Sequence, residues 1–219
     1  MPRFVIHTIP GSPYARAVLA TLEEKGAPWR LAPLAPGDHK RGAHLDRQPF
    51  GKMPVLEHDG FTLYETQAIL RYLDRILPAP SLTPADPRIA ARMDQVMNVN
   101  DCYLFPGCGN VIVFHRVVGP KLLGLAPDEA AIAEAMPQAR IVFPELSRLL
   151  GEQPFFAGEA LSLADMMLGP QLDFFSAAPE WAELTASASN LVGWLERMRA
   201  RPSMQATTWQ RVAAAAEAA

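Results

Sequence analysis

The chain has 219 residues, 49% hydrophobic and 20% charged, so it can form one or two domains with a full apolar core. Its 20 Lys and Arg residues against 23 Asp and Glu residues leave a net charge of −3, which gives no long-range attraction to nucleic acid or to an anionic membrane. The apolar runs are far shorter than the roughly 18 residues that span a bilayer. Cys102 and Cys108 form no C-x-x-C pair and no N-terminal segment reads as a secretion signal, so we expect a cytoplasmic protein whose partner is a small molecule or a protein.

The first 77 residues change hydrophobic period in a regular way. Phe4 to His7 and Trp29 to Leu34 are typical of short strands, and the segment between them has helical spacing, which predicts a β-α-β unit. Ser12 followed by Pro13 is typical of a helix start, and Gly26 of a helix end.

A hairpin and a second helix should follow. Val55 to His58 and Thr62 to Tyr64 flank Asp59-Gly60, a pair that favours a two-residue turn between antiparallel strands. The next segment repeats apolar residues at helical spacing, and this face should pack on the sheet. The residues of that face are Ile69, Tyr72, Leu73, Ile76 and Leu77.

A proline-rich stretch divides the chain. Residues 78–87 carry no apolar periodicity, and every periodic segment beyond them has helical spacing. The sequence therefore predicts an α/β domain over residues 1–78, a linker over 79–87 and an all-α domain over 88–219.

Three signals stand out in the second half. Ser162 and Asp165 resemble a capping box at the start of a buried helix. Asn190 is a candidate cap for a later helix that ends before Pro202. The alanine-rich residues 212–219 should fray.

Common catalytic and metal motifs are missing from the sequence. The five histidines never fall in metal-ligand spacing with each other or with the cysteines, and no G-x-S-x-G pattern surrounds a serine. Neither a metal site nor a hydrolase triad is predicted.

The stretch from Gln48 to Leu56 places a proline directly before a predicted strand. If the Met53-Pro54 bond is cis, the turn exposes the N–H and C=O of Met53 as an edge that can pair with an extended peptide. The alternative is an ordinary trans turn that enters the strand.

Glu65 and Thr66 open the helix that follows the hairpin. Free N–H groups and a hydroxyl at a helix start can bind an amino-acid carboxylate, and Glu65 can balance its ammonium group. His39, Lys40 and Lys52 can hold a second carboxylate. The alternatives are simple helix capping for the first pair and solvated loop charges for the other three residues.

Four motifs follow one another in the first half of the chain. They are Ser12 six residues before Val18, Gly37-Asp38-His39-Lys40, Pro49-Phe50-Gly51-Lys52-Met53-Pro54-Val55-Leu56 and Glu65-Thr66-Gln67-Ala68-Ile69. Through these motifs residues 4–74 resemble the N-terminal domain of the cytosolic glutathione S-transferases, and most of all the serine-type classes, the plant phi class in particular. The second half is similar mainly in its Ser162-Leu163-Ala164-Asp165 helix start and in residues 190–202.

The resemblance implies an α/β plus all-α fold, with an N-terminal thioredoxin-like domain followed by an all-helical C-terminal domain. It implies glutathione as co-substrate and no metal. It also implies that Ser12 donates a hydrogen bond to the glutathione sulfur and that Met53, before a cis Pro54, pairs with the cysteinyl backbone.

The remaining contacts are implied in the same way. Glu65 and Thr66 would hold the γ-glutamyl head group, while His39, Lys40 and Lys52 would face the glycine carboxylate. Lys52 stands where the phi class usually has glutamine, and Thr66 where it usually has serine, so both positions keep a hydrogen-bond donor.

The implied activity is transfer of glutathione to a small hydrophobic electrophile by a homodimer. A thiol with a pKa of about 8.5 is only a few per cent ionised at pH 7, and the Ser12 hydroxyl would lower that pKa, with Tyr14 as the alternative donor. The first helices of the all-α half would wall the electrophile site, and helix packing is the alternative role for their residues. The candidates for this site are Tyr14, Asn98, Asn100, Tyr103 and Phe105.

Other activities stay open at this point. They are glutathione-dependent hydroperoxide reduction or dehalogenation, and a binding or scaffold role without catalysis, in which Ser12 is only a helix cap. Position 12 lacks the cysteine of the omega and beta classes, which counts against thiol transferase chemistry. The Ser-Ser-Cys start of the zeta class is also missing, which disfavours maleylacetoacetate isomerisation.

Overall fold

The computed structural model describes residues 3–219, and the chain divides into two compact units. The first contains the residues up to Ser81 together with Arg201–Ala219, and the second contains Leu82–Ala200. The first unit holds a mixed sheet with helices and the second is helical, which confirms the predicted α/β plus all-α fold.

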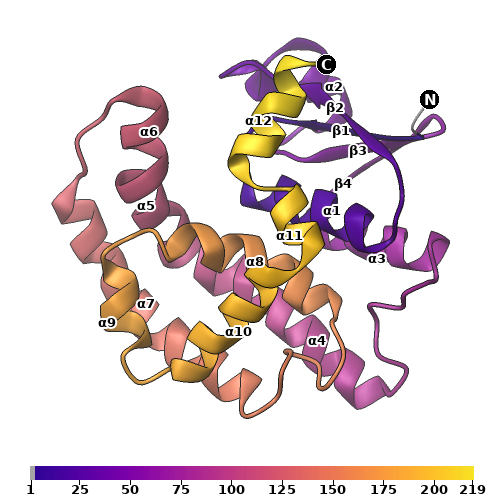
Figure 1. Cartoon of the computed structure of the whole chain (residues 1–219). Coiled ribbons are helices and arrows are strands. Elements are labelled where there is room, and N and C mark those ends of the chain that lie inside the picture. The colour runs from indigo at the N-terminus through magenta and orange to yellow at the C-terminus, as the bar shows by residue number, and fades with distance from the viewer. Residues whose placement is uncertain (1–2) are drawn as a thin grey trace. The chain divides into compact units, whose positions relative to one another are not determined.

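The first unit is built on a four-stranded sheet with the order β2-β1-β3-β4 (Figure 1). β1 pairs parallel with β2 and antiparallel with β3, and β3 pairs antiparallel with β4. Asp59 and Gly60 both have positive φ, as the predicted two-residue turn requires. The strands are β1 (Phe4–Thr8), β2 (Trp29–Pro33), β3 (Val55–His58) and β4 (Phe61–Tyr64), which confirms the β-α-β unit and the hairpin.

Helices α1 (Pro13–Glu24) and α3 (Thr66–Ile76) lie side by side on one side of this sheet, and α2 (Gly42–Arg47) lies on the other (Figure 1). A short 3₁₀ turn, η1 (Asp38–Lys40), precedes α2. The helix start predicted at Ser12-Pro13 is confirmed, because Ser12 caps α1 and Pro13 is its first residue. Apolar residues of β1, β3, α1 and α3 form the core of this unit.

Helix α3 buries Ile69 and Leu73 of the predicted apolar face, but its buried face is turned away from Ile76. Ile76, expected on the buried face, is 38% exposed. The buried residues of α3 are Thr66, Ile69, Leu70, Leu73 and Asp74. The Asp74 carboxylate accepts a hydrogen bond at 2.5 Å from Nζ of Lys25, at the end of α1. An apolar pattern does not include the polar residues Thr66 and Asp74, although both lie on the buried face of α3.

The second unit is helical throughout its regular structure. Wide π-helical turns continue the first long helix beyond residue 99. The elements are α4 (Pro87–Val99), η2 (Asn100–Gly109), α5 (Asn110–Val113), η3 (Phe114–Val118), α6 (Gly119–Leu123), α7 (Glu129–Leu150), α8 (Leu163–Phe175), α9 (Glu180–Thr185) and α10 (Ser189–Ala200).

The predicted capping box at the start of α8 is confirmed. The Asp165 carboxylate accepts hydrogen bonds from the backbone N–H and the hydroxyl of Ser162, at 2.9 and 2.7 Å. It also accepts from the Phe156 N–H at 2.9 Å and from Nε1 of Trp194 at 2.8 Å. Burial raises the pKa of Asp165, and these donors oppose that shift.

The prediction that Asn190 caps a helix is wrong, because α10 begins one residue earlier, at Ser189. Nδ2 of Asn190 donates to the carbonyl oxygens of Ser147 and Gly151, at 2.8 and 2.9 Å. Asn190 therefore links α10 to the end of α7. Those acceptors lie about 40 residues away in sequence, so a local capping pattern could not reveal them.

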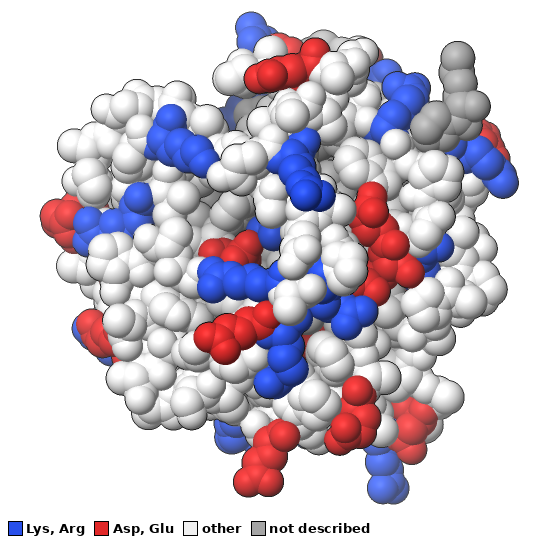
Figure 2. All heavy atoms as spheres, in the orientation of Figure 1, with Lys and Arg blue, Asp and Glu red and all other residues white. Residues whose placement is uncertain are grey.

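Positive and negative side chains are mixed on the face that Figure 2 shows, and neither charge forms an extended patch there. Lys and Arg side chains lie interspersed with Asp and Glu side chains there. None of the helices within residues 3–219 combines the length and apolar character needed to cross a membrane. In the same described residues, no three His, Cys, Asp or Glu side chains are grouped to hold a metal ion.

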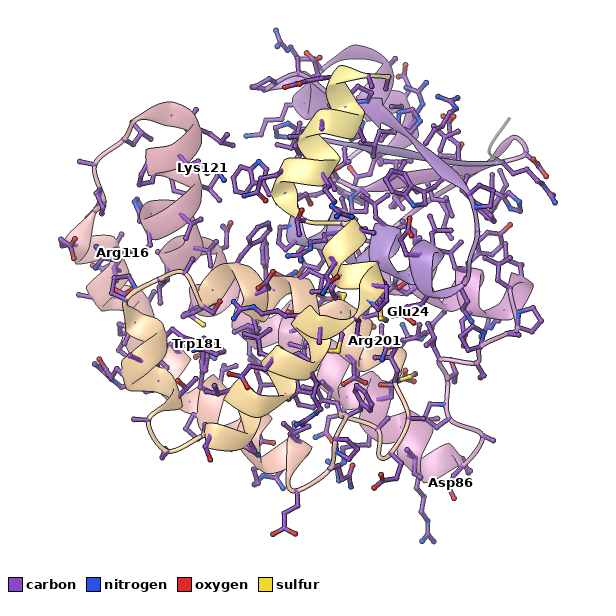
Figure 3. The ribbon with its side chains drawn as sticks, viewed as in Figure 1. Glu24, Asp86, Arg116, Lys121, Trp181 and Arg201 are labelled. Atoms are coloured by element: carbon purple, nitrogen blue, oxygen red, sulfur yellow. The ribbon has the colours of Figure 1, made fainter. Side chains whose placement is uncertain are left out.

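The segment after α10 belongs to the first unit, although the sequence predicts one domain over residues 88–219. Arg201 donates from Nε and Nη2 to the two carboxylate oxygens of Glu24, at 2.7 and 2.8 Å (Figure 3). The hydroxyl of Ser203 donates to the same carboxylate at 2.5 Å. This ion pair joins residues 177 positions apart, so it leaves no local signal in the sequence.

The prediction that residues 212–219 fray is wrong up to Glu217. The segment forms α11 (Pro202–Ala206) and α12 (Trp209–Glu217). Trp209 and Val212 are buried and anchor α12 to the first unit. The alanine content alone gave no indication of this anchor.

Candidate active site

The sheet topology gathers the predicted ligand-binding residues of the first unit at one end of the sheet. β1 and β2 are parallel and end there, β3 begins there, and β4 ends there. In the register, Val55 pairs with both His7 and Tyr64, so the residues just beyond these three lie next to one another. The predicted residues that follow β1, β2 and β4 or precede β3 at this end are Ser12, His39, Lys40, Lys52, Met53, Pro54, Glu65 and Thr66.

Ser12 lies between β1 and α1 and is half-buried. Its Oγ accepts a hydrogen bond from the Ala15 N–H at 3.2 Å. Because a hydroxyl can accept and donate at the same time, capping leaves the Ser12 proton for another acceptor. The two roles that the sequence sets against each other, cap and thiol donor, are therefore compatible. Tyr14 is half-buried in the first turn of the same helix.

Trp209 is a neighbour of this loop that sequence reasoning missed. Its indole ring lies against Gly11, where an added Cβ would come within 2.9 Å of Cζ2 of the ring. Gly11 also has a φ of +92°, a region that favours glycine. The residue beside Ser12 is thus fixed by the C-terminal helix, and nothing local to Gly11 in the sequence points to that partner.

The Met53-Pro54 bond is cis, as the resemblance implies and against the ordinary trans turn. Pro54 is buried, Met53 is half-buried and Lys52 is exposed. The loop before the bond therefore has a surface that a ligand can reach.

The basic residues come together because Gly51 packs closely on η1. With a φ of +60°, Gly51 lies where an added Cβ would be 3.2 Å from the carbonyl oxygen of His39 and 3.5 Å from Cγ of Lys40. This approach places Lys52 beside the His39-Lys40 pair, and both lysines are exposed.

His39 contributes less charge than the sequence suggests. Burial lowers the pKa of His39, and the neighbouring charges of Lys40, His44 and Lys52 lower it further. The ring is therefore less readily charged than that of an ordinary histidine, and a neutral ring can still donate one N–H. A carboxylate bound beside it would raise this pKa again, because an opposite charge favours the protonated ring.

Glu65 and Thr66 lie at the start of α3, as the sequence predicts, but Glu65 does not cap the helix with its side chain. Glu65 has a φ of 68° and a ψ of 112°, an uncommon backbone conformation for a residue other than glycine. It occupies the N-cap position of α3, yet its side chain makes no capping hydrogen bond. Glu65 is exposed, and Thr66 is the buried first residue of the helix.

The candidate electrophile-site residues of the second unit lie on α4 and η2. Asn98 and Tyr103 are exposed and Phe105 is half-buried. Asn100 is completely buried, and its Nδ2 donates to Oδ1 of Asp101 at 3.0 Å. This burial favours the packing role that was the alternative for Asn100, while the roles of the other three stay predictions.

Comparison with known proteins gives consistent matches over most of the chain. Residues 6–81 match the family model "Glutathione S-transferase, N-terminal domain" and residues 129–197 match "Glutathione S-transferase, C-terminal domain". A probable glutathione S-transferase, GSTF2 of Oryza sativa subsp. japonica, is 31% identical over 189 residues, which cover 85% of this chain and 87% of the relative.

Solved structures agree with these sequence matches. Glutathione transferase F2 from Populus trichocarpa superposes with a TM-score of 0.83 at 25% identity, over 95% of this chain and 99% of that one. A theta class glutathione S-transferase from Xanthomonas axonopodis pv. citri, with glutathione bound, gives a TM-score of 0.81 at 26% identity, over 95% and 98% of the two chains.

Proposed function

Because the chain belongs to the glutathione S-transferase family and is most like its phi class, we propose that it binds glutathione and activates the thiol. The binding site would be the end of the sheet where β1 ends and β3 begins. The thiolate would then attack a small hydrophobic electrophile. The observation that carries the proposal is the meeting of Ser12, the cis Met53-Pro54 bond and the Glu65-Thr66 helix start at one end of the sheet. Its relatives are named transferases, so hydroperoxide reduction, dehalogenation and a scaffold role are not favoured.

Each part of glutathione has a matching group in the first unit. The N–H and C=O of Met53 would pair with the cysteinyl backbone. Glu65 would balance the γ-glutamyl ammonium group, and the Thr66 hydroxyl with the first N–H groups of α3 would bind its carboxylate. The glycine carboxylate would lie by the three basic residues His39, Lys40 and Lys52. The bound glutathione of the Xanthomonas relative supports this assignment of the ligand.

The chemistry requires a thiolate, because the neutral thiol is a poor nucleophile. A hydrogen bond from the Ser12 hydroxyl to the sulfur stabilises the anion, and the N-terminus of α1 adds favourable partial charge. A shift of about two units below 8.5 would make most of the bound thiol ionised at pH 7. Sulfur then forms a bond to the electrophilic carbon. At an aryl halide the halide departs with its electron pair, and at an isothiocyanate the electron pair of the C=N bond moves to nitrogen, which takes up a proton.

Retention on immobilised glutathione, followed by a turnover panel, tests this function. The panel holds aryl halides, isothiocyanates and organic hydroperoxides, and formation of the glutathione conjugate is measured beside loss of free thiol. We expect elution by free glutathione and formation of a glutathione conjugate, a thioether from an aryl halide or a dithiocarbamate from an isothiocyanate, with at least one of the first two classes. Retention without any turnover would instead indicate a scaffold, and turnover of hydroperoxides alone a peroxidase.

We also expect a homodimer with twofold symmetry. Phe50 and Phe61 of the first unit are 68% and 49% exposed, and a second copy of the chain can cover such apolar surface. Light scattering should give a mass of about 48 kDa, twice the 24.0 kDa of one chain. A mass near 24.0 kDa at micromolar concentration would contradict the dimer.

A cytoplasmic location fits the state of the two cysteines. Both are free, with Cys102 exposed and Cys108 buried, and free thiols are typical of reducing compartments. Burial raises the pKa of Cys108 to about 12, so this thiol is inert and does not compete with glutathione.

A further inference from the structure

Two buried side chains hold both backbone polar groups of Lys52, the residue before Met53. The Lys52 N–H donates to Oε1 of Gln48 at 2.9 Å, and Nε2 of His44 lies 2.7 Å from the Lys52 carbonyl oxygen. A carbonyl oxygen can only accept, so Nε2 of His44 carries the proton and donates it. Gln48 and His44 are 1% and 3% exposed. We call these two residues the Lys52 bracket.

The bracket determines which way the next residue faces. In a trans peptide bond the C=O of one residue and the N–H of the next point in opposite directions. The Lys52-Met53 bond is trans, and the Lys52 carbonyl points to His44. The Met53 N–H therefore points away from the bracket, on the side where the backbone of an extended peptide can pair with it.

The bracket is fixed to the sheet through α2. This helix has six residues, so packing rather than helix propensity holds it in place. Nε of Arg47 donates to Oε1 of Glu57 on β3 at 2.7 Å. The Gln48 N–H donates to the His44 carbonyl oxygen at 2.9 Å and joins the two bracket residues. The position of Lys52 therefore depends on the contact between α2 and β3 as well as on its own loop.

We propose that His44 and Gln48 are positioning residues for glutathione. They hold Lys52 so that the Met53 backbone faces the cysteinyl residue and the Lys52 ammonium group faces the glycine carboxylate. Both are almost completely buried, so they act through Lys52 and not by touching the ligand. The inference rests on the proposed function, which assigns glutathione to this loop.

Kinetics of bracket variants test the proposal. His44→Phe and Gln48→Met each remove one hydrogen bond to Lys52, and each should raise KM for glutathione about tenfold. kcat at saturating glutathione should stay within about twofold, because Ser12 is untouched. His44→Gln keeps an N–H donor near the position of Nε2 and should restore KM to within about threefold of the original.

Thr207→Val is the matched control. It removes a buried hydrogen bond of 2.8 Å, from Thr207 to the Ser203 carbonyl oxygen in the same unit, and should lower the melting temperature with KM unchanged. If Thr207→Val raises KM as much as the bracket variants do, the effect is one of general stability and the proposal fails. An unchanged KM in both His44→Phe and Gln48→Met also overturns it. If His44→Phe does not fold, Gln48→Met and His44→Gln still decide.

Amide hydrogen exchange in the free protein tests the hydrogen bonds of the Lys52 bracket independently of the proposed function. The Lys52 amide should be protected, and Gln48→Met should speed its exchange at least about tenfold. Rapid exchange of this amide in the unsubstituted protein would overturn the bracket whatever the substrate is. A protected amide in a protein that neither binds nor turns over glutathione would instead retain the bracket, refute the proposed function and remove glutathione from the inference.

Discussion

Ser12→Ala should raise the thiol pKa of bound glutathione by a unit or more and lower turnover at neutral pH about tenfold or beyond. The substitution removes the hydroxyl proposed to stabilise the thiolate, and one pKa unit corresponds to about 1.4 kcal/mol. The pH profile of kcat/KM should therefore move to higher pH. Glutathione affinity should change little, because the contacts of Met53, Thr66 and the basic residues remain.

The control must separate this effect from the cap that Ser12 provides for α1. Loss of an N-cap costs about 1 kcal/mol of stability. Thr208→Ala removes another hydroxyl cap of the same unit, an acceptor for the Arg211 N–H at 3.4 Å, and should lower stability without moving the pH profile. Ser12→Thr keeps the hydroxyl and should keep the profile. An unmoved profile in Ser12→Ala would transfer the donor role to Tyr14, which Tyr14→Phe then tests.

Thr66→Ala should weaken glutathione binding by roughly tenfold to 150-fold while kcat changes little. The lost hydroxyl would contact a charged carboxylate, a hydrogen bond worth about 1.5 to 3 kcal/mol. The contact is remote from the sulfur, so binding should suffer more than chemistry. Titration calorimetry measures the affinity.

Thr66→Ser and Thr66→Val complete this test. Serine keeps the hydroxyl and should keep the affinity, whereas valine keeps the shape of threonine and should bind as weakly as alanine does. Unchanged affinity in Thr66→Ala would refute the assignment of this residue. Loss of thermal stability at unchanged affinity would show that Thr66 serves only the start of α3.

Elements with local signals could be predicted from the sequence. Ser12-Pro13 marks the start of α1 because the cap and the first turn involve neighbouring residues. Asp59-Gly60 marks the hairpin because the turn itself requires positive φ at both positions. The binding residues could be proposed only through a family resemblance, because spacing alone favoured solvated charges for the basic residues and left helix capping open for Glu65 and Thr66.

Features that depend on distant partners could not be predicted. Glu24 pairs with Arg201, and Trp209 packs on Gly11, each across more than 170 residues. The role of His44 was missed for another reason. Its partner Lys52 is only eight residues away, but the two meet only after α2 and the turn at Gly51 have formed. A buried histidine in a short helix gives no pattern that reveals such a contact.

A titration of the thiolate absorbance of the glutathione complex tests most directly whether this chain activates the thiol. An ordinary thiol has a pKa of about 8.5, and we expect the bound thiol to titrate about two units lower. The Ser12→Ala complex should titrate a unit or more above the unsubstituted complex. A bound thiol that titrates at the pKa of free glutathione in the unsubstituted protein would contradict thiol activation by this site.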